Sequence, residues 1–405
     1  MYAPGCEFWK LRTLVAGFSV AATALMYPIA RRMGASPAGA ALAVALETFS
    51  LLHAVEARLV LLNTQLLFWL NATLYGGLRW FARANAAARA GAPPMLLGER
   101  LAWAVGVGVL AGNALSVKHT GLATPALVGL EAACGLFFLA RPLFVLDLAA
   151  YVFTMAATYT LYFWVHLSNI AHAHLSLHQE EEFMSAEDQS LLPGSRTFNP
   201  AARPTEGFWR TFVTLNRRMV VHSAAITQPH AWGTRPFDWI FNLRGVSYWG
   251  STNGEQGAET AAVYLFGNPI SQLAVFGALL VLVAAAGVAA RTAAHADGTL
   301  MLLDEFRRAW EPRRAAAALC LAGWVTNLLP YAAIERTCFA YHYMPALVYG
   351  HLLLALLVDA FAGWPGAAAM AAAAAAAFGY WAPWVYALPL SFEAHSRRRW
   401  LEKWN

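Results

Sequence analysis

Tyr264-Leu265-Phe266-Gly267-Asn268-Pro269 marks the point at which a polar region of the chain meets a long apolar one. The polar region before it carries passages such as Phe208-Trp209-Arg210 and Arg235-Pro236-Phe237-Asp238-Trp239. A flexible linker would be rich in Ser, Gly and charge. Trp, Arg, His and Pro are instead typical of a folded surface at the edge of a membrane. We therefore expect residues 168–260 to form a folded loop between two membrane-embedded blocks, 1–167 and 261–405.

The composition indicates a membrane protein built from α-helices. Hydrophobic residues make up 59% of the 405 residues and charged residues only 13%. A soluble domain carries about a quarter charged residues. A transmembrane β-barrel would show segments of about ten residues with alternating hydrophobicity, whereas this chain shows long apolar runs. The fold class is therefore predicted to be an all-α polytopic membrane protein.

The apolar runs divide into ten predicted transmembrane helices, each of about twenty residues. Six precede the loop, at 13–30, 37–55, 58–80, 101–117, 121–140 and 145–167. Four follow it, at 261–290, 314–334, 342–362 and 367–389. Asn268-Pro269 then falls just inside a membrane helix and is expected to break that helix, because proline interrupts the helical hydrogen bonds.

The distribution of Lys and Arg among the short loops predicts the orientation, since these residues favour the cytosolic side. One set of loops collects most of them: Arg31, Arg32, Arg83, Arg89, Arg100, Arg141, Arg291, Arg307, Arg308 and Arg313. The opposite short loops hold little beyond Lys118 and Arg336. The loop 168–260 and both termini are therefore expected to face the lumen. The net charge of +5 mostly reflects these flanking residues, and the sequence has no basic, aromatic-interleaved groove for nucleic acid.

Several short motifs resemble those of the protein O-mannosyltransferase family, the dolichyl-phosphate-mannose–protein mannosyltransferases. Besides Tyr264–Pro269, they are Glu56-Ala57-Arg58-Leu59-Val60-Leu61-Leu62-Asn63, Ser116-Val117-Lys118-His119-Thr120-Gly121-Leu122, Phe183-Met184-Ser185-Ala186-Glu187-Asp188-Gln189 and Tyr341-His342-Tyr343-Met344-Pro345-Ala346-Leu347. The motifs follow the family's order over most of the chain, which favours membership of this family.

The resemblance implies a membrane enzyme of the GT-C type, with a luminal active-site cavity roofed by the loop. This family transfers mannose from dolichyl phosphate mannose to Ser or Thr hydroxyls of secretory-pathway proteins, with inversion. The resemblance therefore implies an endoplasmic reticulum membrane protein that binds a lipid-linked sugar donor and a polypeptide acceptor. It also implies a homo- or heterodimer with a related mannosyltransferase. It implies no metal, and no cofactor beyond the donor substrate.

Several residues are candidates for contact with the donor. The resemblance favours Arg58 as a contact for the donor phosphate, because guanidinium groups bind phosphate through charge-assisted hydrogen bonds. Arg244 is expected to share this role, and Asn268, His342 and Tyr343 are expected to shape the cavity. Further candidates for the cavity wall are Lys118, His230, Arg235, Trp249 and Tyr264.

The resemblance does not identify the general base that the acceptor hydroxyl needs. The family's Asp-Glu pair follows a first span that has no counterpart in this sequence, and Asn63 stands where the family has an Asp. The candidates are Glu47, inside the second predicted span, and Glu56, at the start of the third. Ionisable residues at such depth are costly and often mark functional sites. The alternative is that Glu47 pairs with a neighbouring helix and that Glu56 lies at an ordinary helix end.

Three functions remain open at this point. The chain is an active mannosyltransferase, an inactive homologue that acts as partner or regulatory subunit of a full-length one, or a membrane transporter. Only residues 190–207 stand where eukaryotic family members insert a β-trefoil MIR domain, so a short form is expected. A transporter would show paired broken helices and charges along a path, and the sequence shows one clear break. An upstream reading frame that encodes the Asp-Glu pair would separate the first two functions.

A group of histidines at the end of the sixth predicted span raises the question of a metal. His166, His172, His174 and His178 have spacings that occur in metal sites, with Glu180–Glu182 close by in the sequence. An exposed helix end explains the same pattern, and we favour that explanation.

Overall fold

The structure is a computed structural model that describes residues 7–88, 93–137, 143–169, 189–191, 195, 197–202, 207–252, 260–294 and 313–404. The elements up to residue 169 are α1 (Phe8–Arg32), α2 (Pro37–Thr48), α3 (Leu51–Glu56), α4 (Asn63–Ala87), α5 (Leu97–Val117), η1 (His119–Leu122), α6 (Ala123–Phe137) and α7 (Val145–Asn169). Those from residue 208 onward are α10 (Phe208–Ala225), α11 (Pro236–Ile240), β1 (Val246–Thr252), β2 (Thr260–Leu265), α12 (Pro269–Ala294), α14 (Arg314–Leu328), α15 (Pro330–Ala333), η4 (Ala340–Tyr343), α16 (Met344–Tyr386) and α17 (Phe392–Arg398).

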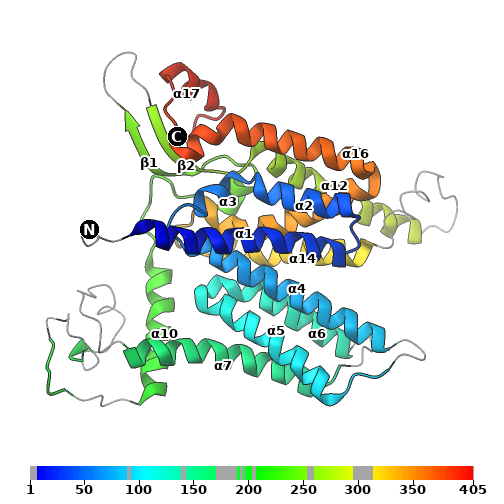
Figure 1. Ribbon diagram of the computed structural model, residues 1–405, viewed down its shortest axis with the longest axis vertical. Helices are drawn as coiled ribbons and strands as arrows, with labels where there is room; N and C mark the ends of the chain where they lie inside the picture. The colour runs from blue at the N-terminus through cyan, green and yellow to red at the C-terminus, as the bar shows by residue number, and fades with distance from the viewer. Residues whose placement is uncertain are drawn as a thin grey trace.

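The long helices run side by side and pass back and forth along one axis (Figure 1). The small elements α10, α11, β1, β2 and α17 gather at one end of this bundle, which we call the loop end. Helix α10 lies there across the axis of the bundle rather than along it (Figure 1). The opposite end carries the turn between α1 and α2. Ser36 in this turn donates its backbone N–H to Asp359 of α16 at 2.9 Å, and we call this end the Asp359 end.

The structure confirms the predicted class of multi-span membrane protein. Six helical segments of the described residues are long and apolar enough to cross a membrane: Phe8–Arg32, Leu97–Val117, His119–Phe137, Val145–Asn169, Arg314–Ala333 and Ala340–Tyr386. Helix α2 and residues Pro269–Ala285 are apolar but shorter. The total of ten spans stays a prediction.

The predicted span 37–55 is not one helix, because it breaks between α2 and α3. Phe49 ends α2, and Ser50 caps α3 by accepting the backbone N–H of His53 at 3.4 Å. The carbonyl oxygen of Phe49 accepts a hydrogen bond from the Asn268 side chain at 2.9 Å. Non-helical backbone can persist inside a membrane protein when protein groups satisfy it in this way.

The next predicted span, 58–80, begins later than expected. Helix α4 starts at Asn63, and residues 57–62 form a non-helical connection between α3 and α4. Glu56 and Arg58 therefore lie at the loop end of the bundle, beside this connection, and not within a continuous helix.

The predicted span 261–290 was wrong at its start. Residues Thr260–Leu265 form strand β2, which pairs antiparallel with β1 from Val246↔Leu265 to Thr252↔Thr260. The predicted helix break at Asn268-Pro269 was also wrong, because α12 begins there. The Asn268 side chain accepts the backbone N–H of Ile270 at 3.1 Å, and proline suits the first position of a helix. Within the described residues the fold is thus helical with one two-stranded sheet.

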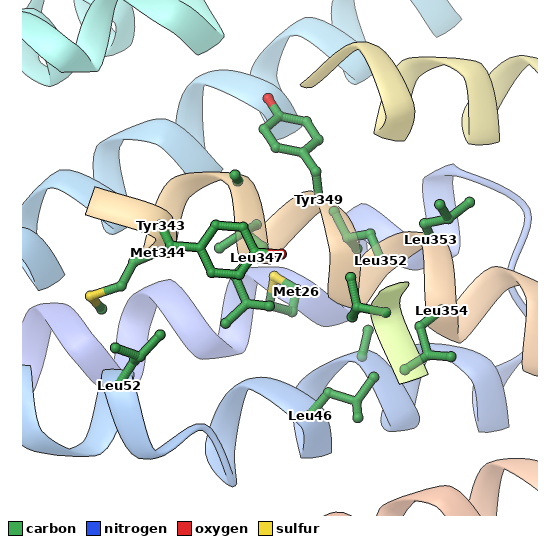
Figure 2. Packing of buried hydrophobic residues seen from close by; sticks show 14 of the residues in the cluster. Met26, Leu46, Leu52, Tyr343, Met344, Leu347, Tyr349, Leu352, Leu353 and Leu354 are labelled. Carbon is green, nitrogen blue, oxygen red and sulfur yellow. The ribbon is translucent and has the colours of Figure 1, made fainter. Parts of the chain in front are cut away.

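The predicted spans 342–362 and 367–389 lie in α16, which turns sharply at Gly363. Gly363 has φ +57° and ψ −154°, a backbone conformation that is essentially restricted to glycine. The half of α16 before this turn lies at the centre of the molecule. Figure 2 shows its side chains Leu347 and Leu352, with Tyr343 of η4, packed near Met26 of α1 and Leu46 of α2.

Two glycines let α5 and α7 approach each other closely. A β-carbon on Gly108 would lie 2.7 Å from the carbonyl oxygen of Tyr151, and one on Gly112 would lie 2.7 Å from that of Met155. The two glycines are four residues apart, the spacing of small residues at packed membrane helices. Gly106, on the same helix, has open space around its α-carbon.

We predict that Gly112→Val lowers the thermal stability of the protein and that Gly106→Val does not. The valine side chain at position 112 meets backbone of α7, and such overpacking typically costs about 1–3 kcal/mol. The same substitution at position 106 meets no neighbour and differs only in helix propensity, by a few tenths of a kcal/mol. Melting of the two variants in the same detergent measures the difference. Equal melting temperatures would contradict the packing described for α5 and α7.

Candidate functional site

A fully buried carboxylate lies at the loop end of the bundle. Glu56, the last residue of α3, is 0% exposed. Its Oε1 accepts a hydrogen bond from the hydroxyl of Tyr248 on β1 at 2.8 Å. Its Oε2 accepts one from the side-chain amide of Asn63, the first residue of α4, at 2.9 Å. Both oxygens are thus held by side chains from separate parts of the chain.

Lys118 brings a cation to this carboxylate. It follows the end of α5, and its Nζ donates to the Asn63 side-chain oxygen at 3.4 Å. The same Nζ lies 5.2 Å from the centre of the Tyr341 ring, a cation–π distance. Asn63 therefore bridges Lys118 and Glu56, and we call Glu56, Asn63, Lys118 and Tyr248 the Glu56 cluster.

Burial moves both ionisable groups of the cluster toward their neutral forms. It raises the pKa of the Glu56 carboxyl above its ordinary 4.5, and the hydrogen bonds from Asn63 and Tyr248 partly oppose this shift. Burial also lowers the pKa of Lys118 below 10.5, and the Glu56 charge opposes that change. The pKa of Tyr248 is raised by burial and by Glu56, so the phenol stays protonated and remains a hydrogen-bond donor.

A small pocket opens beside the cluster. It is lined by Asn63, Leu66, Lys118, Thr120, Tyr331, Tyr341, His342, Met344 and Pro345. A second cation, Arg336, is close enough to Lys118 and His342 to act on both electrostatically. Its Nη1 donates to Ser223 of α10, while its Nε is buried and has no hydrogen-bond partner among the described residues. The pocket lining is largely aromatic and apolar, and Lys118 is its cation.

Arg58, the predicted phosphate contact, is exposed at the same end of the bundle. Its Nη1 donates to the carbonyl oxygen of Val385, and its guanidinium carbon lies 4.5 Å from the centre of the Tyr386 ring. Arg58 therefore binds the end of α16, and contact with the donor stays a prediction.

Arg244 and Asn268 differ in how fully their polar atoms are used. The Arg244 Nε is buried and has no hydrogen-bond partner among the described residues. The Asn268 amide nitrogen, by contrast, donates to the carbonyl oxygens of Phe49 and Ala374, both at 2.9 Å. Asn268 thus joins three segments of the fold, whereas Arg244 keeps a donor for a further partner.

His342 and Tyr343 point to different surroundings. His342 lines the pocket and packs on Trp239, with 6.0 Å between the ring centres. Tyr343 lies in the hydrophobic core (Figure 2), where its hydroxyl accepts a hydrogen bond from the Trp324 indole N–H at 3.1 Å. Of these two predicted cavity residues, the pocket lining includes His342 only.

The remaining predicted wall residues lie at the loop end but not in the pocket lining. His230 packs on Phe339, and Arg235 donates to the carbonyl oxygen of Ile334 at 2.7 Å. Trp249 is 50% exposed. Tyr264 is fully buried, and its hydroxyl accepts the backbone N–H of Gly245 at 2.8 Å. Tyr264 holds the start of β1 in place.

Glu47, the other candidate base, lies away from the pocket. Its carboxylate contacts His53 Nδ1 at 2.5 Å and His351 Nδ1 at 2.9 Å. These contacts match the alternative prediction for Glu47, in which its side chain pairs with side chains of neighbouring helices.

The structure brings no metal-binding group together among the residues that it describes. His166 is exposed near the end of α7. The other three members of the histidine group, His172, His174 and His178, lie outside the described residues.

The sequence argument missed Tyr248, Tyr341, Arg336 and the partners of Glu47. Tyr248 gave no local signal, because tyrosine is common at a membrane edge, and Tyr341 belonged to a quoted motif without being assigned to the site. His53 and His351 did give one, since ionisable residues inside apolar runs are rare and tend to be paired.

The fold and the site together define a polytopic helical membrane protein with a buried carboxylate and a lysine-lined pocket at one end of its bundle. Two family models match the chain. Residues 1–167 match the model for dolichyl-phosphate-mannose-protein mannosyltransferase. Residues 208–404 match the model for the C-terminal four-transmembrane region of protein O-mannosyltransferase. The chain belongs to the protein O-mannosyltransferase family.

Curated relatives share part of their length with this chain. Dolichyl-phosphate-mannose–protein mannosyltransferase 1 of Candida albicans is 26% identical over 194 residues, covering 45% of this chain and 19% of the relative. Protein O-mannosyltransferase 1 of Drosophila melanogaster is 25% identical over 181 residues, covering 45% of this chain and 19% of the relative. The human protein O-mannosyl-transferase 1 is 29% identical over 160 residues, covering 38% and 19%. The match thus spans about a fifth of each relative.

A solved structure shares the fold. It is the S. cerevisiae protein O-mannosyltransferase Pmt1-Pmt2 complex bound to the sugar donor. The TM-score is 0.76 at 15% sequence identity, and the match covers 98% of this chain and 80% of the other. The likeness confirms the predicted GT-C type of fold.

We predict that Glu56→Gln removes a pH dependence of stability. A carboxyl whose folded pKa is raised makes the folded state bind more protons than the unfolded state. Its contribution to stability is full below the unfolded pKa of about 4.5 and is lost as pH rises through the folded pKa. Wild-type melting temperatures should therefore fall more steeply above pH 4.5 than those of the glutamine variant. Parallel curves for the two proteins would contradict a raised pKa at Glu56.

Proposed function

We propose that this protein transfers mannose from dolichyl phosphate mannose to Ser or Thr hydroxyls of secretory-pathway polypeptides. Membership of the protein O-mannosyltransferase family supports this reaction class. The observation that carries the proposal is Glu56, a buried carboxylate held near Lys118 and a small pocket at the loop end. A transfer with inversion needs a base on one side of the sugar carbon and a stabilised phosphate on the other.

Glu56 is the proposed general base. Its raised pKa makes it a stronger base than an exposed carboxylate, provided that it is ionised when the acceptor binds. The carboxylate takes the proton of the acceptor hydroxyl while the acceptor oxygen forms a bond to C1 of mannose. The bond between C1 and the phosphate oxygen breaks at the same time, and dolichyl phosphate leaves with that electron pair.

Lys118 and Arg336 are the proposed partners of the departing phosphate. Lys118 lines the pocket, and Arg336 carries a buried Nε without a described partner. Such donors stabilise negative charge most strongly where water is excluded. Arg58 and Arg244 are proposed to bind the same phosphate from the loop side, with His342 shaping the sugar site.

The loop end is proposed to face the lumen of the endoplasmic reticulum, with the long helices in the membrane and α10, α11, β1, β2 and α17 on the luminal side. The Lys and Arg distribution supports this orientation. The solved neighbour is a complex of two family members, and we propose a related subunit as partner for this chain. In the second function, this chain would be the inactive subunit of such a complex and the related subunit would carry the activity.

We predict that Glu56→Gln lowers kcat for mannose transfer by roughly 10²–10⁴-fold with little change in KM. The amide keeps the size of the side chain but cannot accept the proton. The assay follows transfer from dolichyl phosphate mannose to a Ser/Thr peptide in membranes that contain this chain.

Glu99→Gln is the matched control, because Glu99 pairs with Arg83 at the start of α5, near the Asp359 end. Full activity of Glu56→Gln would exclude Glu56 as the base. The folded wild-type chain alone could show no transfer and become active when a related subunit is added. That result would favour the second function, a partner subunit without its own activity.

We also predict that Arg58→Ala abolishes or strongly weakens transfer, and that Arg58→Lys does not restore it. Lysine keeps the charge but lacks the planar fork that binds phosphate at two points. Arg79→Ala serves as control, because Arg79 likewise stacks on aromatic rings, Tyr75 and Trp103, but lies on α4. Initial rates over a range of donor concentrations measure the effect. Wild-type rates for Arg58→Ala would remove Arg58 from the site.

A further inference from the structure

Three ionisable side chains meet inside the bundle, apart from the pocket. Glu47 of α2 contacts His53 of α3 through one carboxylate oxygen and His351 of α16 through the other, at 2.5 and 2.9 Å. The second nitrogen of His53 lies 2.6 Å from the hydroxyl of Ser19 on α1. The exposures are 4% for Glu47, 3% for His53 and 0% for His351. The group joins the first three helices of the chain to α16, which lies about 300 residues further along.

The carboxylate of Glu47 is contacted by two imidazole rings. A carboxylate buried in an apolar bundle requires compensating hydrogen bonds or charge. Nδ1 of His53 and Nδ1 of His351 make these contacts, one from α3 and one from α16. The second nitrogen of His53 bonds the Ser19 hydroxyl, which can donate or accept, and the Nε2 of His351 has no partner among the described residues. The network thus ties Glu47 of α2 to α1, α3 and α16.

The network lies at the break between α2 and α3. Helix α3 has only six residues, too few to be stable without tertiary contacts. His53 is one turn before Glu56 on this helix. One end of α3 is thus held by the network, and the other end by Asn63 and Tyr248 through the Glu56 carboxylate.

We propose that Glu47, His53 and His351 are positioning residues that set the place of Glu56 through α3. The inference rests on the proposed function, because it concerns the base of the same reaction. Glu47 is then not a base itself, although it was one of two candidates. A directional network suits this task, since hydrogen bonds fix orientation where apolar packing fixes only proximity.

The first test is Glu47→Gln, which removes the charge and keeps the size. We expect kcat for mannose transfer to fall roughly 10- to 100-fold with KM little changed, because small displacements of a catalytic group cost rates of this order. We also expect faster backbone hydrogen exchange over residues 51–62. Asp359→Asn is the matched control. It makes the same change in an acid that is buried at the Asp359 end, and should leave exchange over 51–62 unchanged.

The second test separates positioning from overall stability. The triple variant Glu47→Met, His53→Leu, His351→Leu replaces the whole network by apolar side chains, a change that is often neutral or stabilising for a buried ion pair. We expect the melting temperature of this variant to be close to that of the wild type. Its kcat should still be lowered, and its backbone hydrogen exchange over residues 51–62 should still be faster than in the wild type. Recovery of wild-type kcat together with stability would overturn the proposal.

The exchange measurement needs no activity, so it is independent of the proposed function. Absence of transfer by every form of the chain would count against mannose transfer and leave the exchange comparison intact. If Glu47→Gln exchanges over residues 51–62 at the wild-type rate, as the control Asp359→Asn is expected to do, the positioning role is overturned.

Discussion

A break in a helix inside a membrane bundle leaves backbone groups that need partners, and the rest of this structure depends on how Asn268 supplies them. Its amide reaches the carbonyl oxygens of Phe49, at the α2–α3 break, and of Ala374, in the second half of α16. Its side-chain oxygen caps the start of α12. Since unsatisfied backbone is not tolerated at membrane depth, the break persists only while these bonds are in place. The residue that resembled a helix breaker thus joins three segments.

The break allows α3 to end at Glu56, where four distant segments contribute to one polar site. α3 brings the carboxylate, α4 the amide of Asn63, β1 the hydroxyl of Tyr248, and the end of α5 the ammonium of Lys118. A chain with 13% charged residues can bury few of them, and each buried charge needs a partner. Asp147 and Asp359 are also buried and pair with Arg100 and Arg313, whereas Glu47 and Glu56 have no arginine partner among the described residues. Both carboxylates lie in the chain segment that carries the break.

The sequence was sufficient for the class and for most helices, because the length of an apolar run is a local property. The sequence did not predict contacts between residues that are far apart in the chain. Strand β2 read as the start of a membrane helix because β1, its partner, gives no local sign of pairing. Tyr248 and Glu56 are 192 residues apart, and Glu47 and His351 are 304 apart, so neither contact follows from spacing. Arg58 was found as a residue of the loop end, but its contact with the end of α16 was not.

The contact between Asn63 and Glu56 gives a physical reason for an asparagine at position 63, where the family pattern predicts an Asp. An acidic residue at position 63 would put a second carboxylate within hydrogen-bonding distance of Glu56, and two such groups cannot both ionise without repulsion. Asparagine instead donates to Glu56 and accepts from Lys118, which relays the cation to the carboxylate. In this chain the negative charge lies at the end of α3, and the amide at the start of α4 is the group that holds it.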